Sequence, residues 1–140
     1  MGRVIGIDLG LKRTGLAVTD PDQLIATPLD VISTEHLMDY LKRYVKEETV
    51  EGFVLGEPVK PDGTPTHTTE KVRDLFEKLQ AVFPDRVVAL VDERYTTSMA
   101  MDAMIRGGTS RKYRKTKGNI DKISATIILQ SWLERKKWKK

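Results

Sequence analysis

Short runs of apolar residues alternate along this chain with longer segments in which apolar residues recur every three or four positions. Two of the short runs, residues 4–9 and 14–19, surround a glycine-containing turn and predict an antiparallel β-hairpin. Further strands are expected at residues 25–33, 52–56 and 87–91, and the last of these is expected to be buried. Pro28 cannot donate a hydrogen bond to a neighbouring strand, so it predicts an edge position or a bend for the third strand.

The longer segments predict amphipathic helices, because their apolar residues fall at helical spacing. They lie at residues 34–45, 68–82, 97–105 and 119–136. Thr34 is the expected N-cap of the first of them. Strands that alternate with helices after a leading hairpin predict an α/β fold: a mixed five-stranded sheet, antiparallel in the hairpin and parallel afterwards, with helices on both faces. No repeat or composition shift marks a boundary, so residues 1–140 are expected to form a single domain.

Composition narrows the class of protein. With 140 residues, of which 39% are hydrophobic and 31% charged, the chain is expected to be soluble and globular rather than disordered. The absence of cysteine excludes a disulfide framework, a thiolate metal site and a cysteine nucleophile. Apolar runs are too short for a membrane span, and the chain does not open on a signal-peptide pattern. We therefore expect no membrane partner and a cytoplasmic location.

Charge is unevenly distributed along the chain. Residues 1–105 carry 12 Lys and Arg against 18 Asp and Glu, whereas residues 106–140 carry 12 against 2. An acidic body with a strongly basic C-terminal quarter indicates a polyanionic partner that approaches from one side. Nucleic acid is the expected partner.

Acidic residues stand at the ends of several of the predicted elements. Asp8 ends the first apolar strand, Glu57 follows the fourth, Asp92 and Glu93 end the fifth, and Asp121 opens the last helix. An ionised carboxylate in a buried strand costs several kcal/mol unless a positive group compensates it. Taken singly, each acid could instead cap a turn, face water or complement a helix dipole. Their coincidence favours a metal site at the carboxyl ends of the strands.

The expected cofactor is Mg²⁺ or Mn²⁺, because both are hard cations that prefer oxygen ligands. In a two-ion site, metals about 4 Å apart stabilise the attacking and leaving oxygens of a phosphodiester displacement. A bridging carboxylate such as Asp8 could hold both ions. The pattern therefore predicts a nuclease that needs no side-chain nucleophile.

Basic residues supply candidate contacts to nucleic acid. Residues 111–117 contain no acid, and phosphate contacts made by such a segment give affinity with little sequence choice. Tyr113 could stack on an unpaired base, although a solvated loop is the alternative. The candidates are Lys12, Arg13, Arg94, Arg111, Lys112, Tyr113, Arg114, Lys115 and Lys117.

Four segments carry a resemblance to a known family. They read G-I-D-L-G-L-K-R-T-G-L-A-V-T-D at residues 6–20, D-G-T at 62–64, D-E-R-Y-T-T at 92–97 and K-G-N-I-D-K-I-S-A-T-I-I-L-Q at 117–130. Together they resemble the YqgF/RuvX family, whose members are described as Holliday junction resolvases and as pre-16S ribosomal RNA nucleases. The resemblance implies an RNase H-like fold, with Asp8, Glu93 and Asp121 as catalytic, metal-binding acids.

One departure from the family concerns Glu57. The family usually has a Gly-apolar-Pro sequence after the fourth strand, whereas this chain has Gly56-Glu57-Pro58. In the related RuvC-type resolvases a catalytic glutamate lies near that strand end. Glu57 and Asp92 are therefore additional candidate ligands, with a solvated loop residue as the alternative for Glu57.

Three classes of function follow from these patterns. The first is a metal-dependent endonuclease, which the resemblance assigns to 5′-end processing of precursor 16S rRNA in ribosome biogenesis, with Holliday junction resolution as the alternative. A resolvase would act as a homodimer, because a four-way junction needs two sites related by a two-fold axis. The other classes are a non-catalytic nucleic-acid-binding module and an actin-like ATP-binding fragment, since Asp8-Leu9-Gly10 and Thr14-Gly15 also occur in that superfamily's phosphate loop.

Overall fold

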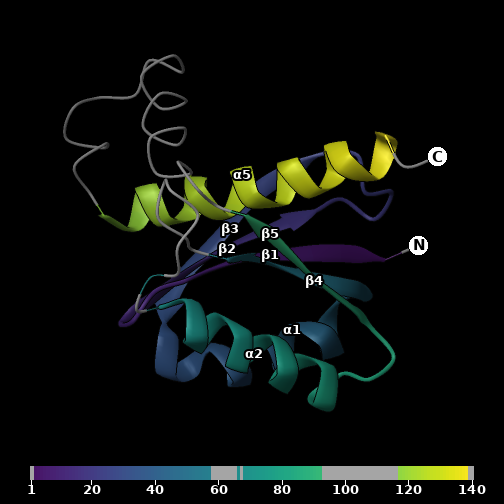
Figure 1. Cartoon of the computed structure of the whole chain (residues 1–140). Coiled ribbons are helices and arrows are strands. Elements are labelled where there is room, and N and C mark those ends of the chain that lie inside the picture. Colours follow the sequence, from purple (N-terminus) through teal and green to yellow (C-terminus); the bar gives the residue numbers. More distant parts are fainter. Residues whose placement is uncertain (1, 58–65, 67, 93–116, 139–140) are drawn as a thin grey trace.

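A computed structural model describes residues 2–57, 66, 68–92 and 117–138 of the chain. Its five strands form one sheet in the order β3-β2-β1-β4-β5. Two helices cover one face of this sheet and the long C-terminal helix covers the other (Figure 1). The elements are β1 (Arg3–Leu9), β2 (Arg13–Thr19), β3 (Ala26–Ser33), a 3₁₀ turn (Thr34–His36), α1 (Leu37–Glu47), β4 (Val50–Glu57), α2 (Thr69–Val82), β5 (Val87–Asp92) and α5 (Lys117–Trp138).

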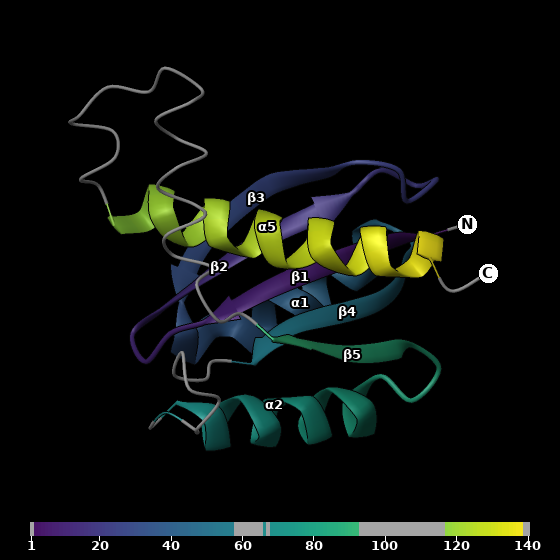
Figure 2. The ribbon, with the colours of Figure 1, turned by 45° about the horizontal axis from the view of Figure 1, so that its top comes forward.

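The strand pairing confirms the expected mixed sheet. β1 and β2 form the antiparallel hairpin, while β1 with β4 and β4 with β5 pair in parallel. β3 lies at the edge of the sheet, as Pro28 predicted, and its pairing with β2 shifts register between Leu16 and Ala17, next to the proline. Figure 2 shows α5 lying across the strands, with β5 and α2 at the opposite side of the sheet from β3.

Side-chain alternation along the strands divides the core in two. Toward α1 and α2 the sheet presents Ile5, Ile7, Leu16, Phe53 and Leu55, all at most 1% exposed. Toward α5 it presents a smaller set that packs on the buried side of that helix. This second cluster consists of the strand residues Val4, Ala17, Val54 and Val91 and of Ala125, Ile128 and Leu129 on α5. Each fully buried large apolar side chain contributes about 1.5–3 kcal/mol, so both faces of the sheet anchor their helices.

The structure corrects two expectations about the elements, and a third concerns residues that it does not describe. Thr34 is not the N-cap of α1: it is the first residue of the 3₁₀ turn that precedes this helix, and the N-cap of α1 is His36. β5 is an edge strand with half-buried side chains rather than a fully buried strand, because only β4 pairs with it among the described strands. The helix expected at residues 97–105 lies outside the described residues. Within the described part of the chain, no helix is long and apolar enough to cross a membrane.

Candidate metal centre

Asp8 lies at the carboxyl end of β1 and on the face of the sheet that α5 covers. In β1, the alternate residues Val4 and Gly6 contact α5, whereas Ile5 and Ile7 face the core beneath α1 and α2. Asp8 lies on the same face as Val4 and Gly6, because successive side chains alternate between the two faces of a strand. It pairs with Gly15 of β2 and is only partly exposed. The carboxylate therefore faces the same layer as the C-terminal helix.

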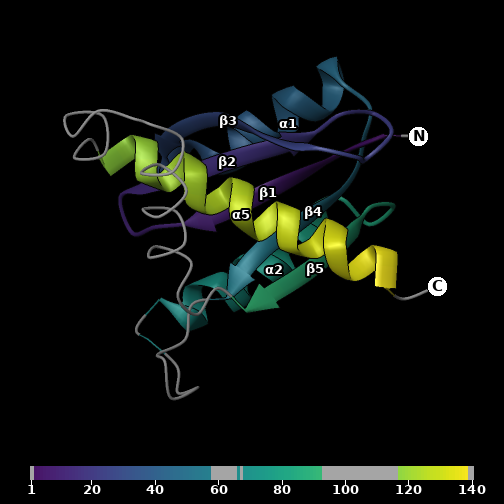
Figure 3. The same cartoon turned by 90° about the horizontal axis from the view of Figure 1, so that it is seen from above.

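Asp121 approaches the same place from α5. It precedes Ala125 and Leu129 at intervals of four residues, and both of those are 0% exposed against the sheet. Residues at this spacing share one face of a helix, so Asp121 belongs to the sheet-facing side. A Cβ placed on Gly15 would overlap the backbone carbonyl of Asp121. The structure thus brings Asp121 onto the residue that pairs with Asp8 (Figure 3 shows α5 crossing the hairpin).

Glycines flank Asp8 on both neighbouring strands. Gly15 pairs with it on one side. On the other side Ile7 pairs with Leu55, so Gly56 is the residue of β4 level with Asp8. Neither glycine places a side chain beside Asp8, and at Gly15 the backbone of Asp121 occupies the position that a Cβ would take. Carboxylate oxygens are the donors that a hard divalent cation prefers.

Arg13 provides a positive charge at this position. Its Nε lies 3.5 Å from Oδ2 of Asp121, with the two side chains 44% and 29% exposed. An ion pair this accessible to water contributes only about 0–1 kcal/mol to stability. Its effect is therefore local: the guanidinium offsets the negative charge of Asp121. Lys12, the preceding residue, is exposed in the hairpin loop.

Thr34 holds the hairpin loop in place. Its backbone N–H donates to the carbonyl of Lys12 at 3.0 Å, and its hydroxyl donates to the carbonyl of Gly10 at 2.7 Å. Because that hydrogen is used, the fully buried Thr14 donates its own hydroxyl to Oγ1 of Thr34, at 2.8 Å. Sequence analysis missed this role. The only local signal was a polar residue that directly follows β3, whose last residue pairs with Arg13.

Glu57 and Asp92 share the carboxyl edge but not the face of Asp8. They pair with each other across β4 and β5, and they continue the parity of Leu55 and Leu90, which face α2. Nε of Arg73 on α2 lies 3.1 Å from Oε2 of Glu57. Glu57 must leave this arginine in order to bind an ion on the other face.

The side chains of the other predicted site residues are not among those that the structure describes. Glu93, Arg94, Arg111, Lys112, Tyr113, Arg114 and Lys115 lie outside the described residues, and Lys117 begins α5 without a described side chain. Among the residues whose positions are described, no group of three or more acids or histidines could hold a metal ion. Of the predicted acidic ligands, Asp8 and Asp121 are the two that the described residues bring to one face of the sheet.

Comparison with known proteins places these features in a family. Residues 2–135 match the profile of the family described as RuvX, Holliday junction resolvase. A candidate pre-16S rRNA nuclease of Amoebophilus asiaticus is 46% identical over 133 residues, which cover 95% of this chain and 94% of the relative. Another, of Flavobacterium johnsoniae, is 44% identical over 138 residues, covering 99% and 100%.

Solved structures share the fold. Thermus thermophilus RuvC in complex with a Holliday junction substrate has a TM-score of 0.58 at 17% identity, covering 96% of each chain. The fowlpox virus resolvase bound to Holliday junction DNA has a TM-score of 0.57 at 11% identity, covering 95% of this chain and 97% of the resolvase. These likenesses confirm the expected RNase H-like fold.

The close approach at Gly15 gives a first prediction. We expect Gly15→Ala to lower the free energy of unfolding by about 1–3 kcal/mol, the usual cost of overpacking, because the backbone of α5 must move. The displaced start of α5 should also weaken Mn²⁺ binding at least tenfold. Urea denaturation and titration with Mn²⁺ followed by electron paramagnetic resonance measure the two effects.

Gly6→Ala is the matched control. Its added Cβ would lie 2.8 Å from Cβ of Leu129 and 2.9 Å from the carbonyl of Ala125, one to two turns farther along the same helix. It should lose comparable stability but retain more of the Mn²⁺ affinity. Wild-type Mn²⁺ affinity in Gly15→Ala would show that the helix start does not contribute to an ion site.

Proposed function

The chain belongs to the RuvX family, and from that premise we propose that it is a divalent-metal-dependent endonuclease that hydrolyses phosphodiester bonds in structured nucleic acid. One observation carries the proposal: Asp8 pairs with Gly15, and Asp121, from a distant part of the sequence, packs against the same glycine on the face that α5 covers. Because the relatives named above are candidate pre-16S rRNA nucleases, we assign 5′-end processing of precursor 16S rRNA, a cytoplasmic step of ribosome biogenesis.

Holliday junction resolution is the second candidate. The family description and the DNA complexes of the two solved structures both name such junctions. This candidate requires a homodimer, because the two cuts across a four-way junction need two sites related by a two-fold axis. Processing of a single RNA strand needs only one site.

We propose Asp8, Asp121 and Glu93 as the ligands of Mg²⁺ or Mn²⁺, with two ions. Ala89 and Val91 of β5 face α5, and the next position of that parity in the sequence is Glu93. When bound, such ions stabilise the attacking and leaving oxygens of the displaced phosphodiester. Glu57 and Asp92 are kept only as further candidates, because Glu57 already forms an ion pair with Arg73.

The protein's own contribution is positioning. The strand pairing of β1 holds the backbone of Asp8, and the packing of α5 holds the backbone of Asp121. Holding reacting groups in place in advance lowers the entropic cost of reaching the transition state. Arg13 can release Asp121 and bind a phosphate of the substrate instead, because a guanidinium can hold a phosphate through two parallel hydrogen bonds.

The central test compares two labelled substrates, precursor 16S rRNA and a four-way DNA junction. We expect Mn²⁺-dependent cleavage of the RNA at its 5′ side, complete loss of cleavage in EDTA and little cleavage of the junction. Denaturing electrophoresis measures the products. Preferential cutting of the junction would reverse the choice of substrate.

Asp8→Asn is the control for that test. The amide has nearly the shape of the carboxylate but no charge, so we expect cleavage to fall below detection while affinity for the RNA stays within about threefold. Thermal unfolding establishes that the variant is folded. Tight binding without cleavage by the wild-type protein would instead identify a non-catalytic binding module.

Arg13→Gln tests the phosphate contact. Because the Arg13–Asp121 pair is exposed to water, its loss should change the free energy of unfolding by less than about 1 kcal/mol. The slope of log affinity against log salt should fall by about 0.7 if one phosphate contact of a single strand is lost. Fluorescence anisotropy at several salt concentrations measures the slope, and an unchanged slope would exclude the contact.

The basic segment at residues 111–115 is the second candidate for phosphate contacts. Neutralising Arg111, Lys112, Arg114 and Lys115 together should flatten the same slope by up to about 3, since each lost contact to a single-stranded phosphate contributes about 0.7. Binding at low salt should weaken for every sequence alike. If the slope stays at its wild-type value, the segment does not contact phosphates.

A further inference from the structure

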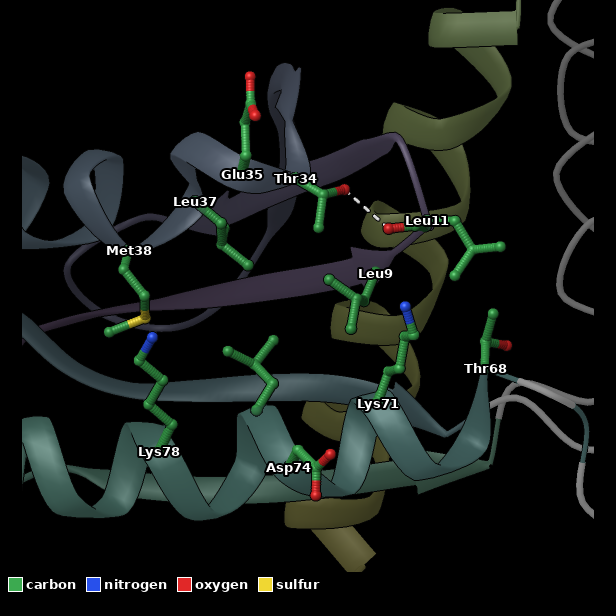
Figure 4. Close-up of a pocket in the computed structure, with 12 residues that line it drawn as sticks. Leu9, Leu11, Thr34, Glu35, Leu37, Met38, Thr68, Lys71, Asp74 and Lys78 are labelled. Carbon is green, nitrogen blue, oxygen red and sulfur yellow. Dashed lines mark hydrogen bonds between the residues drawn. The ribbon is translucent and has the colours of Figure 1, made fainter.

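A cavity of about 480 Å³ opens on the other face of the strand end that carries Asp8. It lies between the β1–β2 loop, the start of α1 and the N-terminal part of α2 (Figure 4). Its volume falls within the range of about 300–1,000 Å³ that is usual for small-ligand sites. The proposed nuclease site lies on the α5 face, so the cavity is a separate feature.

The lining of the cavity combines an apolar floor with two cations. Leu9, Leu37 and Leu75 supply the floor, and the flexible thioether of Met38 completes it. Lys71 extends from α2 toward the same space. Lys78 extends toward it as well: Lys71 lies nearer the hairpin loop and Lys78 nearer Met38 (Figure 4). The acidic residues at the rim, Glu35 and Asp74, turn their carboxylates away from the floor.

Neither lysine takes part in an ion pair within the described part of the protein. The ion pairs found there involve Arg3, Arg13, His36 and Arg73, not Lys71 or Lys78. An apolar floor beneath two ammonium groups that form no ion pair there suits a flat group that carries phosphates. A nucleobase with its flanking phosphates has this chemistry, and methionine sulfur makes favourable contacts with aromatic rings.

The cavity is adjacent to the proposed nuclease site. Leu9 in its wall directly follows Asp8, so their Cα atoms are about 3.8 Å apart along the chain. Successive residues of a strand face opposite sides of the sheet, and a nucleic-acid strand that contacts both must therefore pass around the β1–β2 loop. The hydrogen bonds of Thr34 to Gly10 and Lys12 already fix that loop. A rim ordered beforehand lowers the entropic cost of binding.

We propose that this cavity binds one unpaired nucleotide of the nucleic-acid substrate, with the base on the apolar floor and its flanking phosphates at Lys71 and Lys78. The proposal rests on the proposed function, because it takes the ligand to be part of the strand that is cut. The bound nucleotide positions the neighbouring phosphate at Asp8. Recognition depends on an unpaired base, since a paired base cannot enter the cavity.

Methyl NMR of the intact protein tests this directly, with Met38 as the reporter. The protein is labelled at methionine methyl groups, and Met38→Leu assigns the Met38 signal. Single-stranded RNA and blunt-ended duplex RNA of equal length are titrated in EDTA, which prevents cleavage. We expect the single strand, but not the duplex, to shift the Met38 signal.

The lysines are tested by Lys71→Gln with Lys78→Gln. The matched control is Lys42→Gln with Lys46→Gln, which removes two charges that are also exposed but lie on α1 and do not line the cavity. The first pair should lower the salt slope of single-strand binding by about 1.4, at about 0.7 for each phosphate. The control pair should change it far less. Equal slopes in the two double variants would overturn the assignment of the phosphates.

Two further outcomes have definite meanings. An unshifted Met38 signal at saturating single strand overturns the proposal, and a shift produced by adenosine or uridine monophosphate alone reassigns the cavity to a free nucleotide and overturns it too. Failure of the proposed function looks different: the wild-type protein would cut neither substrate while Met38 still responds to the single strand. Cleavage without a Met38 response would leave the nuclease intact and remove the cavity from it.

Discussion

The close approach of α5 to the β1–β2 hairpin is the constraint on which the rest of the structure depends. Gly6 and Gly15 have no side chains, and a Cβ at either position would collide with the backbone of the helix. The helix therefore lies directly on the strands and buries Ala125 and Leu129 completely. The same contact sets Asp121 beside the residue that pairs with Asp8. Packing energy spread over the length of α5 thus fixes the position of one carboxylate.

Strand alternation then decides which acids can act together. Asp8 faces α5, whereas Glu57 and Asp92 continue the parity that faces α2. On that side Glu57 meets Arg73, which neutralises it without help from an ion. A position at the carboxyl edge of a sheet is therefore not enough to define a shared site, because the two faces of the edge are separated by the sheet itself.

Local sequence patterns were sufficient for the five strands, for the three described α-helices and for the edge position of β3. Strand alternation and helical spacing are visible within a few residues, and a proline that cannot donate to a sheet is visible alone. The contact between Gly15 and Asp121 joins residues more than 100 positions apart and leaves no local trace. Thr34 was misread for a related reason. A threonine before a helix is the usual pattern of an N-cap, but here tertiary contacts with Gly10 and Lys12 use its hydroxyl and backbone N–H.

In the proposed arrangement, the β1–β2 loop lies between the cavity on one face of the sheet and Asp8 on the other, and the substrate strand passes around it. A strand held weakly at the cavity presents its next phosphate to Asp8 at a high effective concentration, so two modest interactions combine into a strong one. Thr34 holds the loop that both sites share, and binding at one face need not reorder the other. The proposed path would discriminate between substrates. If the cavity takes an unpaired base, a substrate with single-stranded nucleotides can occupy both sites at once, whereas the paired arms of a four-way junction can occupy only one.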